Sequence, residues 1–324
     1  MAEAMARWAN PSSPHAEGRA ARAALEDARA RIKTALSWPG ELIFTSGASE
    51  AIALAIGPRA ASAVQTSSVE HDAVLRLTKG ARRLPVDANG RALLDNGADG
   101  LFVVQQANSE TGVIQPLAAL AAIIRPHGGL LFSDCAQSAG KIVLPDADMI
   151  AISAHKFGGP PGVGALLVRD FGVVQAIGGQ EQGYRPGTEN LPGAMAMAAA
   201  LEEGCAWMAE AAGLRRSLDE GIESLGGITV ARDADRIATI AGYRMPGMSA
   251  RAQLIQFDMK GISVSAGSAC SSGTLKASHV LTAMGWNEQA AGEVVRVSFG
   301  PQTNAGDIDR FLDAWTSIAR KAAA

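Results

Sequence analysis

Short apolar runs alternate with alanine-rich amphipathic stretches along the first two thirds of the chain. The stretch 20–36 combines strong helix formers, and Trp38 with Pro39 and Gly40 ends it, so we expect a helix there. The apolar runs predict short strands at 42–44, 62–67, 101–105, 130–133, 149–153 and 165–168. Strands that alternate with helices in this way predict an α/β fold, with a mostly parallel sheet and helices on both of its faces.

The pattern changes after Met208. A helical stretch, a glycine pair and a strand come first, followed by a loop of small residues around Cys270 and a last helix from Ala305. We therefore expect two domains, a large one formed by residues 1–208 and a smaller α+β domain formed by residues 209–324, which carries the Cys270 loop.

Composition narrows the class of protein. The 324 residues are enough for two hydrophobic cores, and 48% hydrophobic with 19% charged residues is typical of a compact protein. A net charge of −3 gives no basic surface for nucleic acid. No segment predicts a signal peptide or membrane span, so we expect a cytoplasmic protein with no membrane partner. The three cysteines and five histidines lack the spacing of a disulfide framework or a metal site.

Lys156 is the first candidate for chemistry. It follows Ser153, Ala154 and His155 where the strand 149–153 ends, and a glycine- and proline-rich bend comes next. A partly desolvated lysine becomes an amine nucleophile, and such amines form Schiff bases with carbonyl compounds, including pyridoxal phosphate (PLP). The alternative is a solvated loop lysine without chemistry.

Two strand ends upstream offer groups that PLP requires. Asp134 ends one apolar strand, and a carboxylate at the carboxyl end of a parallel strand can pair with the pyridinium nitrogen of PLP. Its alternative role is to cap the next helix. Ser46 and Gly47 join the strand 42–44 to a helix whose N-terminus can bind phosphate. Without a ligand, the same pattern with Glu50 is only a helix cap.

His71 and Cys270 complete the candidates. His71 can stack on a cofactor ring and carry protons, or it can be a half-buried loop histidine. Cys270 lies among serine, alanine and glycine residues, which is typical of an exposed and reactive thiol. The alternative is a solvent-facing cysteine without a role.

Taken in their order, these motifs resemble the cysteine desulfurases of the class V aminotransferase family, which are fold-type I PLP enzymes. The resemblance covers nearly the whole chain, and its segments are 10–15, 44–50, 70–71, 108–112, 134–138, 153–164, 178–190, the Cys270 loop and 295–300. It implies a fold-type I PLP-dependent transferase, with a mostly parallel sheet in the large domain and a smaller α+β domain.

The resemblance also implies a role for particular residues. Lys156, Cys270 and His71 are the implied catalytic residues, with Lys156 holding PLP and His71 stacking on its ring. Asn108 and Arg296 are the implied substrate-binding residues, Arg296 as a bidentate clamp on the substrate carboxylate. The implied cofactor-binding residues are Ala48, Ser49, His71, Ser109, Asp134, Gln137, Ser153, His155, Lys156 and Thr188, with Ser49, Ser153 and His155 at the phosphate, Asp134 at the pyridine nitrogen and Gln137 at the ring hydroxyl.

The implied reaction turns L-cysteine into L-alanine and leaves a persulfide on Cys270, so we expect a sulfur-acceptor protein or an iron–sulfur scaffold as a partner. Thr188 is implied to reach the phosphate of a neighbouring subunit, which implies a homodimer. The chain departs from the family in Ser109, where a second asparagine is usual, and it starts after the family's first Thr-Thr-type strand segment. Two other functions stay open: a related PLP aminotransferase or lyase on another amino acid, with Cys270 dispensable, and a catalytically silent dimeric scaffold.

Overall fold

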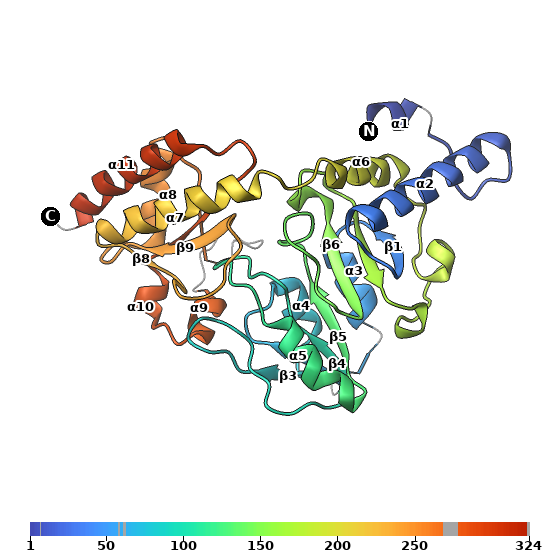
Figure 1. Ribbon diagram of the computed structural model, residues 1–324, viewed down its shortest axis with the longest axis horizontal. Coiled ribbons are helices and arrows are strands. Elements are labelled where there is room, and N and C mark those ends of the chain that lie inside the picture. The colour runs from blue at the N-terminus through green and yellow to red at the C-terminus, as the bar shows by residue number, and fades with distance from the viewer. Residues whose placement is uncertain (7, 58, 61–62, 268–277, 323–324) are drawn as a thin grey trace.

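The computed structural model describes the chain apart from residues 7, 58, 61–62, 268–277 and 323–324. Cys270, the predicted sulfur acceptor, lies outside the described residues. Two sheets organise the molecule, a seven-stranded sheet in the first part of the chain and a four-stranded sheet near its C-terminus (Figure 1). No helix in the described part is long and apolar enough to cross a membrane.

The large sheet has the strand order β1-β7-β6-β5-β4-β2-β3. Its strands are β1 (Glu41–Thr45), β2 (Val64–Ser67), β3 (Arg82–Leu84), β4 (Leu101–Val103), β5 (Leu130–Asp134), β6 (Met149–Ser153) and β7 (Gly164–Val168). β7 runs antiparallel to both of its neighbours, and all the other pairs are parallel. The prediction of a mostly parallel sheet is therefore confirmed, and the carboxyl ends of β1, β2, β4, β5 and β6 meet at one edge.

Helices cover both faces of this sheet. One face carries α2 (Ala16–Ala35), α5 (Leu117–Ile124) and α6 (Leu191–Glu202), and the short α1 (Ala2–Ala6) packs on α6 (Figure 1). The other face carries α3 (Ala48–Ile56) and α4 (Asp72–Leu77). Each face has its own buried cluster, with Leu25 and Ile32 of α2 in the first and Ile52 of α3 in the second. Burial on both faces explains why the central strands are apolar throughout.

The predicted strands agree with the observed ones to within a few residues, but two elements differ from the sequence analysis. α2 begins at Ala16 rather than at residue 20, because Nδ1 of His15 accepts a hydrogen bond from Gly18 N (3.2 Å) and caps the helix. β3 was not expected. This edge strand exposes Arg82 and Arg83 and buries only Leu84, so its sequence lacks the apolar run that marks the inner strands.

The second unit begins with α7 (Met208–Ser224), next to the predicted domain boundary at 208/209, which stays a prediction. Its antiparallel sheet has the order β10-β11-β9-β8. The elements are β8 (Ile228–Thr229), β9 (Ile240–Arg244), α8 (Ala250–Asp258), β10 (Ser265–Ala266), α9 (His279–Ala283), α10 (Glu288–Ala291), β11 (Val294–Ser298) and α11 (Ala305–Ala322). Tyr243, Phe257, Phe311 and Trp315 form an aromatic core between this sheet and its helices.

Two small apolar clusters join the units. In one, Val69 of the large unit packs with Val280 and Leu281 of α9. In the other, Ala107 packs with Ile237 and Ile240. These contacts place α9 and β11 of the second unit beside the carboxyl edge of the large sheet.

Candidate active site

A cavity of about 670 Å³ lies at this edge. Its walls come from the segments that follow β1, β2, β4, β5 and β6, and from α9 and β11 of the smaller unit. Ligand sites of open α/β sheets lie at such strand ends, because the loops there converge on one point while the sheet holds their bases fixed. We refer below to the large-unit wall and the small-unit wall of this cavity.

The cavity brings together most of the predicted site residues. Those that line it are Ala48, Ser49, His71, Ser109, Asp134, Gln137, Ser153, His155, Lys156 and Arg296. Two others, Asn108 and Thr188, do not line it. Residues from segments far apart in the sequence therefore meet in one place, as the resemblance implies.

One end of the cavity is built for an anion. Gly47 is the N-cap of α3, directly before the first helical residue. The first N–H groups of a helix have no partner within the helix. Ser153 lies next to this helix start, since a Cβ added to Gly47 would lie 3.4 Å from Ser153 Oγ. Ser153 Oγ is also 3.0 Å from Nδ1 of His155. Helix N–H groups, a hydroxyl and an imidazole make a donor set suited to phosphate.

The capping interpretation of the α3 start is also partly correct. Glu50 Oε2 accepts a hydrogen bond from Ser46 N at 2.5 Å, and Glu50 Oε1 accepts one from Nε of Arg185 at 2.8 Å. The Arg185 and Ser46 hydrogen bonds hold the pKa of Glu50 below its usual value against the effect of burial. The carboxylate thus fixes the loop before α3, and the first two residues of the helix, Ala48 and Ser49, line the cavity.

Asp134 lies at the end of β5 with only 6% of its surface exposed. Its Oδ1 accepts a hydrogen bond from Ala136 N (2.9 Å), so the predicted capping contact is present beside the predicted catalytic position. Burial raises the pKa of Asp134, while the nearby charges of His71 and Lys156 act in the opposite direction. A buried carboxylate of this kind is stabilised by a cationic partner in the cavity.

Glu70 is a second buried carboxylate in the same wall, and the sequence analysis did not assign it a role. It is fully buried, and it accepts hydrogen bonds from Ser67 Oγ (2.5 Å) and Gln105 N (3.0 Å). Burial raises the pKa of Glu70 to about 8, and the neighbouring charge of Asp134 acts in the same direction. Its position beside His71 was the only signal in the sequence that could have revealed it.

His71 and Lys156 are held in different ways. Nδ1 of His71 accepts a hydrogen bond from Ala73 N (3.1 Å) and so caps α4. Lys156 sits in a single 3-10 turn, Ala154–Lys156, at the end of β6. Its positive charge, together with burial, lowers the pKa of His155, and it also contributes to the lowered pKa of Lys141, which is about 8 mainly because of burial.

Among the described residues, three side-chain hydrogen bonds join the small-unit wall to the large unit. Nη1 of Arg296 on β11 donates to the carbonyl of Ser109 (3.1 Å). Nε2 of His279, the first residue of α9, lies 2.9 Å from the carbonyl of Glu70. Ser278 Oγ donates to Glu110 Oε2 (2.5 Å). His279 and Glu110 both line the cavity, and the sequence analysis missed both because no local spacing connects them to the other motifs.

Asn108 was expected to bind substrate, but the structure gives it another environment. The residue is buried and its side-chain amide donates to the carbonyl of Val69 (3.0 Å). Its side-chain oxygen accepts hydrogen bonds from the N–H groups of Glu110 and Thr111, each at 2.9 Å. Asn108 therefore shapes the turn that presents Ser109 and Glu110. The usual second asparagine is Ser109 here, and its main-chain carbonyl orients Arg296 whatever the side chain is.

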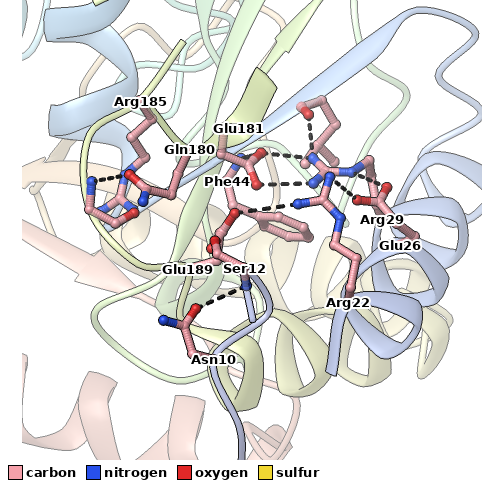
Figure 2. Close-up of polar contacts among 12 residues, drawn as sticks. Asn10, Ser12, Arg22, Glu26, Arg29, Phe44, Gln180, Glu181, Arg185 and Glu189 are labelled. Carbon is pink, nitrogen blue, oxygen red and sulfur yellow. Dashed lines mark hydrogen bonds and ion pairs between the residues drawn. The ribbon is translucent and has the colours of Figure 1, made fainter. Parts of the chain in front are cut away.

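Thr188 is exposed on the loop 178–190, away from the cavity of its own chain. Figure 2 shows how this loop is fixed: Arg29 forms two hydrogen bonds with Glu181 (2.8 and 3.0 Å), and Glu181 also accepts one from Phe44 N (2.8 Å). Arg185 binds Glu50 of α3, as described above. The loop thus presents Thr188 from a rigid base toward the outside of the chain.

Comparison with known proteins identifies the family. Residues 2–311 match the aminotransferase class-V family. The chain belongs to this family. It is 35% identical to a cysteine desulfurase of Gluconacetobacter diazotrophicus over 97% of this chain and 87% of the relative, and 34% identical to cysteine desulfurase IscS 1 of Archaeoglobus fulgidus, over 97% and 90%.

Solved structures agree. A NifS-like protein from Rickettsia africae superposes with a TM-score of 0.88 at 27% identity, covering 98% of this chain and 94% of that one. The structure of SspA in complex with cysteine superposes with a TM-score of 0.76 at 28% identity, covering 92% and 93%. The resemblance seen in the sequence, and the fold-type I architecture that it implied, are confirmed.

The family uses PLP, and the residues of this cavity fit it. The anion end offers helix N–H groups with Ser153 and His155. Asp134 is a buried carboxylate that needs a cation, which a protonated pyridine nitrogen supplies. Lys156 lines the same cavity and provides the amine. The cavity therefore offers a suitable partner for each polar group of PLP: the anion end for the phosphate, Asp134 for the ring nitrogen and Lys156 for the carbonyl.

Proposed function

We propose that this chain is a PLP-dependent cysteine desulfurase that converts L-cysteine to L-alanine and transfers the sulfur to Cys270 as a persulfide. The observation that carries the proposal is the pairing of two walls in one cavity. The large-unit wall holds Lys156, Asp134 and the α3 start, and the small-unit wall presents Arg296. One wall is suited to PLP and the other to the carboxylate of an amino acid.

The large-unit wall would hold the cofactor. Lys156 would bind its carbonyl carbon, Asp134 its pyridine nitrogen, and Ser49, Ser153 and His155 its phosphate. Bound there, PLP supplies an electron sink for the bonds at the α-carbon of the substrate. His71, fixed by its capping bond to Ala73, would lie against the ring.

The small-unit wall would bind the substrate. The guanidinium of Arg296 pairs with the carboxylate of L-cysteine, and its hydrogen bond to the carbonyl of Ser109 sets its orientation. In the overall reaction the carbon–sulfur bond of L-cysteine breaks and a sulfur–sulfur bond to Cys270 forms. The carbon that loses sulfur gains a proton and becomes the methyl group of L-alanine.

The finer expectations follow from the same proposal. Thr188 faces away from its own cavity, which supports a homodimer in which it serves the phosphate of the partner subunit. The persulfide requires a partner that takes up the sulfur, namely a sulfur-acceptor or iron–sulfur scaffold protein. We also propose that the protein lies in the cytoplasm. Cys135 is a poor acceptor because burial raises the pKa of its thiol to about 12.

The test is to incubate PLP-reconstituted protein with L-cysteine and to measure alanine, sulfide and the protein persulfide. We expect Cys270→Ser to keep the cofactor absorbance and to lose almost all sulfur release. Cys205→Ser, at an exposed cysteine, is the matched control and should behave like the wild type.

Two outcomes would replace the proposal. Wild-type turnover by Cys270→Ser would favour a lyase or aminotransferase that does not use this thiol. A wild-type protein that cannot be reconstituted with PLP would favour a silent scaffold. In Lys156→Ala, a specific covalent link to PLP should be lost while the fold is retained, which far-ultraviolet circular dichroism would check.

A further inference from the structure

Glu50 is a carboxylate at the end of the cavity that is suited to an anion. It lies in the first turn of α3 and lines the cavity together with Ala48 and Ser49. An unpaired negative charge at this position would repel a phosphate group, because like charges interact strongly where little water screens them. The anion end can therefore bind phosphate tightly only if the charge of Glu50 is compensated.

The carboxyl group of Glu50 is ionised in the folded protein. Burial acts to raise its pKa, but the hydrogen bonds from Arg185 and Ser46 outweigh burial, so the pKa is lowered. The first turn of a helix also favours a negative charge. Since protonation does not remove this charge near neutral pH, a cation must balance it.

Arg185 is the cation that balances Glu50. Its Nε donates to Oε1 of Glu50 at 2.8 Å, and only 16% of the Arg185 side chain is exposed. The other oxygen of Glu50, Oε2, accepts the N–H of Ser46 (2.5 Å). Arg185 itself does not line the cavity, so it can act on a bound anion only through Glu50.

The loop 178–190 holds Arg185 in this position. The main chains of Gln180 and Arg185 exchange two hydrogen bonds, at 3.0 and 3.3 Å, which close the loop into a tight hairpin. Glu181 lies inside this hairpin, and 1% of its side chain is exposed. The base of the loop is therefore buried, and the Arg185 side chain starts from a fixed point.

The same loop is bonded to β1, the strand that leads to the anion end. β1 is the last strand in the order of the large sheet, so its outer edge has no neighbouring strand among the described residues. Arg29 donates to the carbonyl of Leu42 (2.5 Å), and Glu181, which is paired with Arg29, accepts the N–H of Phe44 (2.8 Å) (Figure 2). The ion pair thus bonds this edge as another strand would.

We propose that Arg185 is a positioning residue for the phosphate of the cofactor bound by its own chain. It neutralises Glu50 and holds it against Ser46, so that a phosphate dianion meets no unpaired carboxylate at the anion end. The inference rests on the placement of the PLP phosphate at this end in the proposed function. It does not depend on the reaction with L-cysteine.

The first experiment compares two ligands on the full-length apoprotein. PLP and pyridoxal share the ring and the aldehyde, but pyridoxal lacks the phosphate, so the ratio of their dissociation constants isolates the phosphate end. Arg185→Gln leaves Glu50 without its cation, and we expect the dissociation constant of PLP to rise by about 10–100-fold, the range for lost contacts that orient ligands at metal sites. The dissociation constant of pyridoxal should barely change. Titrations followed by the absorbance of the bound ligand measure both.

The second experiment tests whether the unpaired charge is the cause. Glu50→Gln keeps an acceptor for the N–H of Ser46 but removes the negative charge. Added to Arg185→Gln, it should restore most of the lost affinity for PLP. A loop that had only lost its shape would not be rescued by this second substitution.

Arg244→Gln is the matched control. Nε of Arg244 donates to Oε2 of Glu293 at 2.8 Å, and Glu293 also accepts the N–H of Gly247 (3.2 Å), so the arrangement at Glu50 is repeated within the smaller unit. Neither Arg244 nor Glu293 lines the cavity. We expect this variant to bind PLP and pyridoxal as the wild type does.

Three results would overturn the proposal. They are an equal loss of affinity for PLP and pyridoxal in Arg185→Gln, no restoration of PLP affinity by Glu50→Gln, and a wild type that binds pyridoxal as tightly as PLP. The last result would also remove the phosphate from the anion end. If the wild type prefers PLP but releases no sulfur from L-cysteine, the proposed reaction fails, and the two titrations still decide the role of Arg185.

Discussion

The two walls of the cavity are built in different ways. The large-unit wall consists of residues directly after five strands of one sheet, and the hydrogen bonds of the sheet fix the strands that carry them. The small-unit wall meets the large unit through the apolar cluster around Val69 and through single hydrogen bonds from Arg296, His279 and Ser278. The first wall is preorganised for a cofactor that stays bound, and the second is suited to groups that meet the substrate in each turnover.

The comparison also concerns charge. The large-unit wall buries two carboxylates, Asp134 and Glu70, and burial raises the pKa of both. The small-unit wall contributes the guanidinium of Arg296, which stays charged at any pH at which the protein folds. The raised carboxylate pKa values therefore belong to the large-unit wall, whereas carboxylate recognition should come from the small-unit wall.

Arg296→Lys is expected to have the largest effect, and this effect should fall on substrate turnover and not on PLP affinity. An ammonium cannot replace the bidentate geometry of a guanidinium, so kcat/KM for L-cysteine should fall by about 10²–10³-fold. The affinity for PLP should change little, because no residue of the large-unit wall is altered. Steady-state kinetics and a spectroscopic PLP titration measure the two quantities.

The exposed Arg251→Lys on α8 is the matched control for Arg296→Lys and should change neither quantity. A comparable loss of PLP affinity in Arg296→Lys would mean that the walls do not divide cofactor and substrate as we argue.

A smaller effect is expected for Glu70→Gln, and it concerns pH. The pKa of Glu70 is about 8 in the folded protein against an ordinary value of 4.5, so the folded state binds more protons than the unfolded state between these values. The free energy of unfolding must then fall as pH rises from about 4.5 to about 8. Glutamine keeps an acceptor for Ser67 and Gln105 and does not ionise.

We therefore expect the stability of the wild type to fall by several kcal/mol more than that of Glu70→Gln over this range. Urea unfolding of both proteins at several pH values measures it. Parallel pH profiles for the two proteins would show that Glu70 is ionised throughout, which would contradict the raised pKa.

The large-unit wall could largely be predicted from sequence, for a physical reason. Each of its residues stands within a few positions of a buried strand, so Lys156, Asp134 and His71 are marked by the apolar run that precedes them. Parallel strands then bring these ends together without any long-range information. Glu70 was missed because its role depends on the hydrogen bond from Gln105 and on the nearby charge of Asp134, which the local sequence does not show.

The small-unit wall was harder to predict. His279 bonds to a carbonyl 209 residues away, and Ser278 bonds to a carboxylate 168 residues away. No periodicity or spacing reports such pairs, because they depend on how the two units dock. Arg296 was found only through the family resemblance. Asn108 is a different case: its motif position suggested substrate binding, which stays a prediction, and the structure adds a turn-forming role that the sequence did not reveal.

The smallest effect concerns the link between the walls. Ser278 has two roles: its Oγ accepts a hydrogen bond from Leu281 N (3.1 Å), which caps α9, and it donates to Glu110 Oε2 (2.5 Å). Ser249 has only the first, since it caps α8 by accepting from Ala252 N (3.3 Å). Ser249→Ala should therefore cost about 1 kcal/mol of stability, the usual value for a lost cap.

Ser278→Ala should cost about 2 kcal/mol, because it also removes a hydrogen bond to a charged group between the units. The difference can be assigned with a double-mutant cycle that adds Glu110→Gln, where we expect a coupling of about 1 kcal/mol between Ser278 and Glu110 in denaturant unfolding. Equal losses in Ser278→Ala and Ser249→Ala, with no coupling in the cycle, would mean that the hydrogen bond between the walls adds nothing to stability. The apolar cluster around Val69 would then hold α9 against the large unit alone, and the position of His279 would depend on packing and on its own bond to Glu70.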